Sequence, residues 1–193
     1  MAGRQAKILS KAQINTALLS IEMTRNPFRD RVLFLLSLKA GLRACECANV
    51  RWGMIMDAEG NVSNVLALED VAAKKNSGRT IPLNKHLHAA LIDLATQIDP
   101  TPEDHIIRSE RGGPMSANTV VHWFKRLYSK LGYVGCSSHS GRRTFITSGA
   151  RKIGNINGSI RDIQELAGHR SLQMTASYIE GNAQAKRQLV NLI

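Results

Sequence analysis

The stretch "PFRDRVLFLLSLKAGL", residues 27–42, decides the fold. Its side chains from Val32 to Leu36 are apolar nearly all round a helix, a pattern typical of a helix buried on every side. Pro27 suits the first helical turn, where its missing N–H costs little. Gly41 suits a helix end. The sequence therefore predicts a buried helix over residues 27–40, with the rest of the chain packed around it.

The segments on both sides of this stretch are mostly helical in pattern. Ser10, Ser116 and Ser159 are candidate N-caps, each standing before a run of helical apolar spacing. Turn residues at 59–61 and 76–78 break a strand-like region between residues 53 and 83, which predicts a small antiparallel sheet. The fold class is therefore α+β, mostly helical with one small antiparallel sheet. The further helices are expected at 9–22, 42–52, 84–98, 116–132, after 139, at 159–168 and at 175–181.

Composition indicates one basic domain. The chain has 193 residues, of which 43% are hydrophobic, enough for a single core. Its formal net charge is +11, and the excess is spread over both halves of the chain rather than held in a tail. Such a charge favours a polyanionic partner, most simply nucleic acid, although a basic surface can also serve solubility alone.

Other classes of protein are disfavoured. Cys45, Cys47 and Cys136 are odd in number and fit no zinc-site spacing, so no metal or other cofactor is expected. The N-terminus lacks the long apolar core of a signal peptide, and no apolar run approaches the roughly 18 residues of a membrane span. These features indicate a reducing, cytoplasmic location without a membrane.

Charged and nucleophilic side chains recur where elements are expected to end. Arg43 follows Gly41, a lysine stands at a hairpin turn, His139 precedes Arg142 by three residues, and His169 precedes Tyr178 by nine. Each feature alone is ordinary, since a tyrosine in a helix is usually half-buried packing and an arginine at a helix start is usually a solvated charge.

Their order is less ordinary. The segments "KAGLRACECANVRW", "KKNSGRTIPL", "SSHSGRRTFIT" and "LAGHRSLQMTASY" resemble, in sequence order, four motifs of the tyrosine recombinase (phage integrase) family. The resemblance runs from about Ser10 to the C-terminus and implies the mostly helical catalytic domain of that family. The positions that match are Gly41, Leu42, Arg43, Glu46, Arg79, Thr80, Ile81, Pro82, Leu83, His139, Arg142, Arg143, Thr144, Phe145, Leu166, Gly168, His169, Thr175 and Tyr178.

The resemblance implies a site-specific recombinase or integrase that cleaves and rejoins DNA. Tyr178 would attack a backbone phosphate to form a 3′-phosphotyrosine, with no need for ATP or a metal ion. Arg43 and Arg142 would clamp the phosphate oxygens, because paired guanidiniums are charged, bidentate donors. His139 would accept the phenol proton, and His169 would hydrogen-bond the phosphate or orient Tyr178.

Three assignments keep alternatives. The lysine that protonates the leaving 5′-oxygen is Lys74 or Lys75, and the spacing to the motif proline favours Lys74. Gly141 replaces the leucine that the family often has before the second arginine, which leaves Arg143 as an alternative to Arg142. Tyr133 and Tyr128 are the other tyrosines that could act in place of Tyr178.

Double-stranded DNA is the expected partner. The expected DNA contacts come from a basic helix face beside buried aromatics, together with two motif arginines: Lys125, Arg126, Lys130, Arg79 and Arg143. The alternative for the helix over residues 116–132 is a solvated charged face without a binding role.

We expect residues 1–193 to form a single catalytic domain with its core at about 10–180 and no N-terminal core-binding domain, either naturally or as a fragment of a longer protein. The apolar tail, residues 181–193, would either pack on its own domain or be exchanged between protomers. We expect a homotetramer on synapsed DNA sites and a possible monomer when the protein is free of DNA. Accessory DNA-bending proteins are possible further partners. The functional alternatives are a type IB topoisomerase and a DNA-binding regulator that has lost catalysis.

Overall fold

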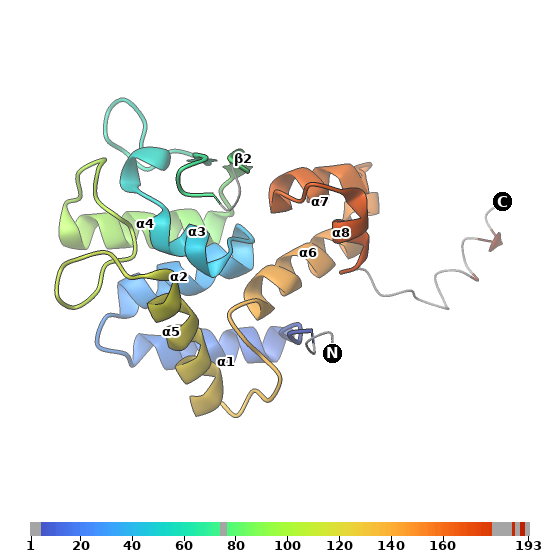
Figure 1. Ribbon diagram of the computed structural model, residues 1–193, viewed down its shortest axis with the longest axis horizontal. Coiled ribbons are helices and arrows are strands. Elements are labelled where there is room, and N and C mark those ends of the chain that lie inside the picture. Colours follow the sequence, from blue (N-terminus) through green and yellow to red (C-terminus); the bar gives the residue numbers. More distant parts are fainter. Residues whose placement is uncertain (1–4, 74–76, 179–186, 188–189, 192–193) are drawn as a thin grey trace.

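The computed structural model describes residues 5–73, 77–178, 187 and 190–191. A body of helices carries a two-stranded sheet at one edge, and three further helices lie beside it (Figure 1). The elements are α1 (Lys11–Glu22), α2 (Pro27–Lys39), α3 (Ala44–Asn49), η1 (Trp52–Met54), β1 (Val65–Leu68), β2 (Arg79–Pro82), α4 (Lys85–Ile98), α5 (Ala117–Lys130), α6 (Ser140–Lys152), η2 (Ile153–Ile156), α7 (Ile160–Ala167) and α8 (Leu172–Ala176).

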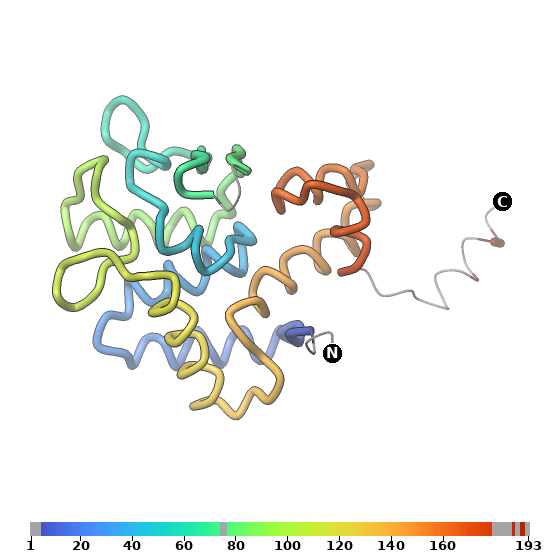
Figure 2. The backbone as a smooth tube through the Cα atoms, viewed as in Figure 1, coloured from blue at the N-terminus to red at the C-terminus, as the bar shows by residue number. Residues whose placement is uncertain are grey.

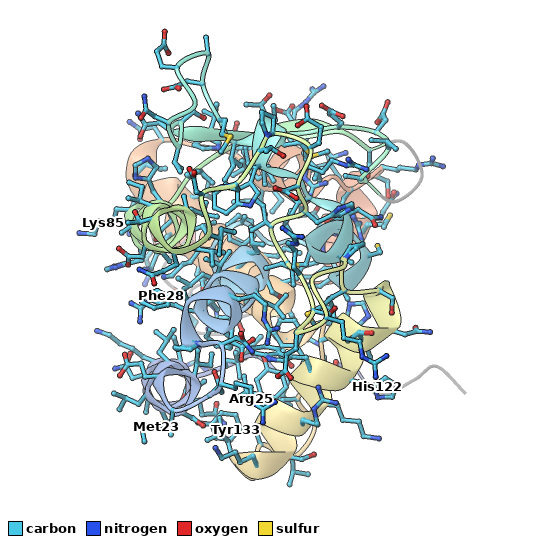
Figure 3. The ribbon with its side chains drawn as sticks, turned by 90° about the vertical axis from the view of Figure 1, so that its left-hand side faces the viewer. Met23, Arg25, Phe28, Lys85, His122 and Tyr133 are labelled. Atoms are coloured by element: carbon cyan, nitrogen blue, oxygen red, sulfur yellow. The ribbon has the colours of Figure 1, made fainter. Side chains whose placement is uncertain are left out.

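Helix α2 lies at the centre of the body, as its apolar pattern predicts. Every side chain from Val32 to Leu36 is at most 1% exposed. Figure 3 looks nearly along three helix axes, with α4, α2 and α1 stacked in a column and α2 in the middle. Helix α6 packs on a further side of α2. The central helix therefore contacts most of the helical body and also the helix that carries the His139–Arg142 motif.

Local sequence signals fix the helix starts. The Ser10 hydroxyl accepts a hydrogen bond from the Gln13 N–H, and the Gln13 side chain accepts one from the Ser10 N–H. Ser116 caps α5 in the same way through the Thr119 N–H. At α7 the Asp162 carboxylate accepts from the Ser159 N–H. Each of these bonds satisfies an N–H that the helix itself leaves unpaired, so the three predicted N-caps are confirmed.

The predicted antiparallel sheet is present but short. Strands β1 and β2 pair with Val65 opposite Pro82 and Leu68 opposite Arg79. The earlier part of the strand-like region instead forms the single turn η1 and one isolated bridge between Met56 and Val62. The Asp57 carboxylate accepts the N–H groups of two following residues there, which closes a turn rather than a strand pair.

Helices α6 and α7 and the turn after α8 form a second, smaller core. Ile146, Ile163 and Ala167 are buried together, and Phe145 and Tyr178 pack against them. The expected helix over residues 175–181 differs from the structure, because α8 ends at Ala176 and the Tyr178 N–H bonds the Thr175 carbonyl in the turn that follows. Residues 179–186 lie outside the described part of the chain. Tyr178 is therefore held by this small core and not by the main one.

The N-terminal segment connects the main helical body with the region of α6, and its course can be followed in Figure 2. The Lys7 N–H bonds the Gly135 carbonyl, and the Leu9 N–H bonds the Thr144 hydroxyl on α6. Among the helices of the described ranges, none is long and apolar enough to cross a bilayer.

Candidate active site

Three arginines from distant parts of the chain converge on the C-terminal end of α7. Arg79 Nε donates to the Leu166 carbonyl at 2.9 Å. Arg142 Nη2 donates to the Ala167 carbonyl at 2.6 Å, and Arg43 Nη2 lies 3.5 Å from the Gly168 carbonyl. The last carbonyls of a helix have no partner within the helix and carry its negative dipole end, so they suit cationic donors.

Glu46 is the carboxylate shared by two of these arginines. Its Oε1 accepts from Arg43 Nη1 at 2.7 Å, and its Oε2 accepts from Arg79 Nη2 at 3.1 Å. The side chain is fully buried. Burial alone would raise the pKa of Glu46, but the hydrogen bond and charge of Arg79, followed by those of Arg43, hold its pKa below the usual value. Glu46 is thus a buried carboxylate ion that orients both guanidiniums.

The cluster keeps an excess of positive charge. Arg142 is only 2% exposed and also donates from Nη1 to the Gly41 carbonyl at 2.6 Å. Burial, followed by the charge of Arg43, lowers the pKa of Arg142 to about 10, so it remains protonated at neutral pH. Three guanidiniums therefore face one carboxylate, an arrangement that favours binding of an added anion.

The glycine before Arg142 has a steric reason. A Cβ on Gly141 would lie 2.5 Å from the hydroxyl oxygen of Ser37 on α2. The two helices approach each other too closely there for any side chain at this position. Gly141 therefore lets α6 pack tightly on α2, and Arg142 points into the arginine cluster.

His169 lies beside these arginines and is 6% exposed. Its Nδ1 is 3.0 Å from the Thr175 hydroxyl oxygen. Its ring stacks on that of Tyr178, with the centroids 5.3 Å apart and the planes 27° from parallel. Burial, followed by the charges of Arg142 and its neighbours, lowers the pKa of His169 to about 4, so the imidazole is neutral at physiological pH.

Tyr178 stands between the arginine cluster and a surface cavity. Its backbone carbonyl accepts a hydrogen bond from the Thr147 hydroxyl, and its side chain lies within electrostatic range of the Arg142 guanidinium. The cavity holds about 310 Å³ and is lined by Tyr178, His139, Arg143 and four smaller neighbours. A phenol, an imidazole and a guanidinium therefore share one solvent-accessible space.

The other two tyrosines, Tyr128 and Tyr133, pack in or against the main core. Tyr128 is 1% exposed, and burial raises the pKa of its phenol well above the usual value. The Tyr133 hydroxyl donates to the Gln13 carbonyl. Neither lies near the arginine cluster, which removes the physical basis for either as an alternative nucleophile.

The structure brings together Arg43, Arg142, His169 and Tyr178, with His139 at the adjoining cavity. Lys74 and Lys75 lie outside the described residues. The expected DNA contacts divide in two groups. Lys125, Arg126 and Lys130 are exposed on α5, and Arg143 lines the cavity, where its Nη1 donates to the Ala6 carbonyl.

Arg79 belongs to the arginine cluster. Its side chain is only 7% exposed and is held by Glu46 and the Leu166 carbonyl, and its assignment as a DNA contact stays a prediction. Sequence reasoning also gave Glu46 and Thr175 no role beyond their place in the motifs. The spacing of Glu46 three residues after Arg43 was an available signal, because such residues are neighbours on a helix surface.

Comparison with known proteins gives a consistent result. Residues 7–185 match the model of the phage integrase family. Tyrosine recombinase XerC of Xylella fastidiosa (strain 9a5c) is 27% identical over 150 residues, which are 78% of this chain and 48% of that protein. The XerC protein of Listeria innocua is 27% identical over 158 residues, 78% of this chain and 49% of that protein. The chain thus spans about half the length of these curated relatives.

Solved structures share the fold. A Tn1549 transposon integrase in complex with a circular intermediate DNA superposes with a TM-score of 0.78 at 19% identity, covering 100% of this chain and 67% of that one. The XerA recombinase gives 0.69 at 24% identity, with 97% and 65% covered. XerH recombinase in a post-cleavage complex with a palindromic difH substrate gives 0.74 at 18% identity, with 98% and 53% covered. At these identities the likeness establishes the fold alone.

Proposed function

The chain belongs to the phage integrase family, and from this membership we propose that it is a site-specific recombinase that cleaves and rejoins double-stranded DNA through a 3′-phosphotyrosine on Tyr178. One observation carries the proposal. The ring of Tyr178 stacks on His169 at the edge of a buried arginine cluster with excess positive charge. A backbone phosphate is the anion that such a cluster suits, and a phenol beside it is a nucleophile.

The arginines would stabilise the transition state. As Tyr178 Oη attacks phosphorus, negative charge grows on the non-bridging oxygens. Arg43 and Arg142 can donate to those oxygens in a fixed geometry, since Glu46 and the α7 carbonyls already orient them. Preorganised donors need little rearrangement as the charge develops, and this is the main source of catalysis by such sites.

Two proton transfers complete the step. The bond from Tyr178 Oη to phosphorus forms, the bond from phosphorus to the 5′-oxygen breaks, and the phenol proton passes to His139 across their shared cavity. We assign protonation of the leaving 5′-oxygen to the hairpin lysine, Lys74 or Lys75. A 5′-hydroxyl of a second strand then reverses the step. The ester keeps the bond energy, so the proposal requires neither ATP nor a metal ion.

The wider assembly is also proposed. The Tn1549 transposon integrase, which shares the fold, is described as a complex with a circular intermediate DNA, and this supports double-stranded DNA as the partner. We propose a tetramer on two synapsed sites, with accessory DNA-bending proteins where the sites require them. Lys125, Arg126, Lys130 and Arg143 are the proposed phosphate contacts.

The decisive experiment traps the covalent intermediate. The protein is incubated with a library of nicked duplexes of randomised sequence, in which cleavage releases a short 5′-hydroxyl fragment and prevents religation. Adducts that survive denaturation are recovered and sequenced. We expect the unmodified chain to yield adducts with EDTA present and without ATP, and Tyr178→Phe to yield none, because it lacks the attacking oxygen.

Tyr133→Phe is the matched control, since it removes a phenol oxygen away from the arginine cluster and should keep adduct formation. Adducts from Tyr178→Phe would place the nucleophile elsewhere. Binding without adducts from the unmodified chain would indicate a silent regulator. Relaxation of supercoiled plasmid by a monomer, without pairing of sites, would indicate a topoisomerase.

A further inference from the structure

Thr175 has a buried hydroxyl that forms one hydrogen bond among the described residues. It is 0% exposed and lies on α8, three residues before Tyr178. Within the described residues, the only hydrogen-bond partner of its hydroxyl is Nδ1 of His169, at 3.0 Å. A buried hydroxyl carries a proton that must find an acceptor, because leaving it unpaired costs free energy.

That requirement fixes the direction of the bond. If Nδ1 carried a proton, it would donate to the Thr175 oxygen and leave the hydroxyl proton without an acceptor. The bond satisfies both groups only when the hydroxyl donates and Nδ1 accepts. A neutral imidazole that accepts at Nδ1 must hold its proton at Nε2.

We propose that Thr175 is a positioning residue that holds His169 in the neutral tautomer protonated at Nε2, so that the imidazole presents an N–H donor to the phosphate. This inference rests on the proposed function for its consequence, but the tautomer itself is a property of the free protein. Stacking on Tyr178 fixes the plane of the ring, and Thr175 fixes which nitrogen carries hydrogen.

The charges around His169 make the tautomer important. Arg142 on α6, Arg43 before α3 and Arg79 on β2 all disfavour an imidazolium, while Glu46 on α3 favours it. A neutral ring has a single N–H. Protonation at Nδ1 instead would turn a lone pair toward the phosphate oxygens and repel them. The choice of tautomer therefore decides whether the ring attracts or repels the substrate.

The test reads the tautomer directly. Protein labelled with ¹⁵N-histidine gives distinct nitrogen shifts for the two tautomers, and a His169→Gln spectrum identifies the signals of His169. We expect the pattern of an Nε2–H imidazole in the free protein between about pH 5.5 and 7.5. A pattern of Nδ1–H in the unmodified protein would overturn the proposal, whatever its activity.

Two substitutions separate this role from packing. Thr175→Ser keeps a hydroxyl and should retain both the tautomer and the rate of adduct formation. Thr175→Val keeps the side-chain shape and removes the donor, so we expect a mixture of tautomers and a rate of adduct formation about 10- to 100-fold lower. An unchanged tautomer in Thr175→Val would refute the assignment.

The outcomes also distinguish the two proposals. The expected spectra without adducts from any variant would contradict the recombinase and leave the tautomer standing. Adducts from the unmodified chain together with an Nδ1–H spectrum would support the recombinase and contradict the proposed tautomer. Thermal unfolding of each variant confirms that the fold is retained, and the spectrum of the unmodified protein depends on no substitution.

Discussion

Glu46 shows how a single buried side chain organises a catalytic cluster before any substrate arrives. Two guanidiniums bond its carboxylate, and the same guanidiniums reach the last carbonyls of α7. Removing one partner of a buried pair leaves an uncompensated charge, which is far more costly than the net contribution of the pair. Glu46 thus orients the Arg43 guanidinium before any phosphate binds.

His169 predicts a dependence of stability on pH. Its folded pKa is about 4, whereas an unfolded histidine titrates near 6.5. Between these values the unfolded chain binds a proton that the folded chain does not, so the free energy of unfolding should fall as pH decreases from about 6.5 to 4. The expected change is about 1.4 kcal/mol per unit of pKa difference. Urea unfolding at several pH values measures it.

The comparison variant is His169→Gln, which should show a flatter decline over this window, because it lacks the titrating ring. Other histidines, including His105, contribute equally to both proteins and cancel in the difference. Parallel curves for the two proteins would show that His169 titrates normally in the folded state.

For single residues, the sequence predicts which side chains come together in the site but not which groups hydrogen-bond them there. Motif order and spacing identify Arg43, Arg142, His169 and Tyr178. Their partners are carbonyls of α7 and the carboxylate of Glu46, which come close only through tertiary packing. The burial of Arg79 beside Glu46 is unpredictable for the same reason, because a basic residue in a motif gives no sign of its burial.

Helix α2 and its C-terminal corner set the positions of the elements around the site. Gly41 has a φ of +66°, and a Cβ there would lie 2.5 Å from the ring of Phe145 on α6. Its carbonyl also accepts from Arg142. One glycine therefore permits a left-handed turn, a close contact with α6 and a hydrogen bond to the cluster.

Gly41→Ala should therefore destabilise the protein for two reasons, backbone strain and the clash with Phe145. Gly132→Ala is the matched control, since Gly132 has a φ of +69° with no atom within 4 Å of its Cβ position. We expect about 1 kcal/mol for Gly132→Ala from backbone strain. Gly41→Ala should cost at least about 1 kcal/mol more. Urea unfolding of both variants measures the difference, and equal losses would contradict the role of the Phe145 contact.

Elements with strong local signals were predictable. The caps at Ser10 and Ser116 and the apolar run of α2 are encoded within a few residues, so their helices appear where expected. The predicted small antiparallel sheet is confirmed, and it occupies only the later part of the strand-like region because the Asp57 turn precedes β1. The helix expected over 175–181 depended on tertiary packing, which gives Tyr178 a turn after α8.

The whole molecule is basic, with a formal net charge of +11, and α5 carries three of its exposed cations. Lys125, Arg126 and Lys130 extend from α5, whose inner face buries Trp123 and Phe124. In Figure 3, Lys85 at the start of α4 and His122 on α5 lie on opposite sides of the view. If these three cations contact phosphates, DNA binding has a definite orientation on the molecule.

Salt dependence tests that placement. Each phosphate contact contributes about 0.9 to the slope of log K against log salt concentration. Single alanine substitutions of Lys125, Arg126 and Lys130 should each reduce the slope by about that amount, and Lys85→Ala, which removes the same charge elsewhere, should not. Fluorescence anisotropy with a labelled duplex at several salt concentrations measures the slopes. Equal effects from all four substitutions would show that only net charge matters.

The three arginines that meet at the end of α7 also determine when the molecule could first become active. Their bonds to that helix end span 125, 87 and 25 residues of sequence. A chain emerging from the ribosome cannot complete these three bonds until residue 168 has been synthesised. Tyr178 follows only ten residues later, so the nucleophile and its electrostatic surroundings are completed together. Under the proposed chemistry, an unfinished polypeptide would be harmless to the genome that encodes it.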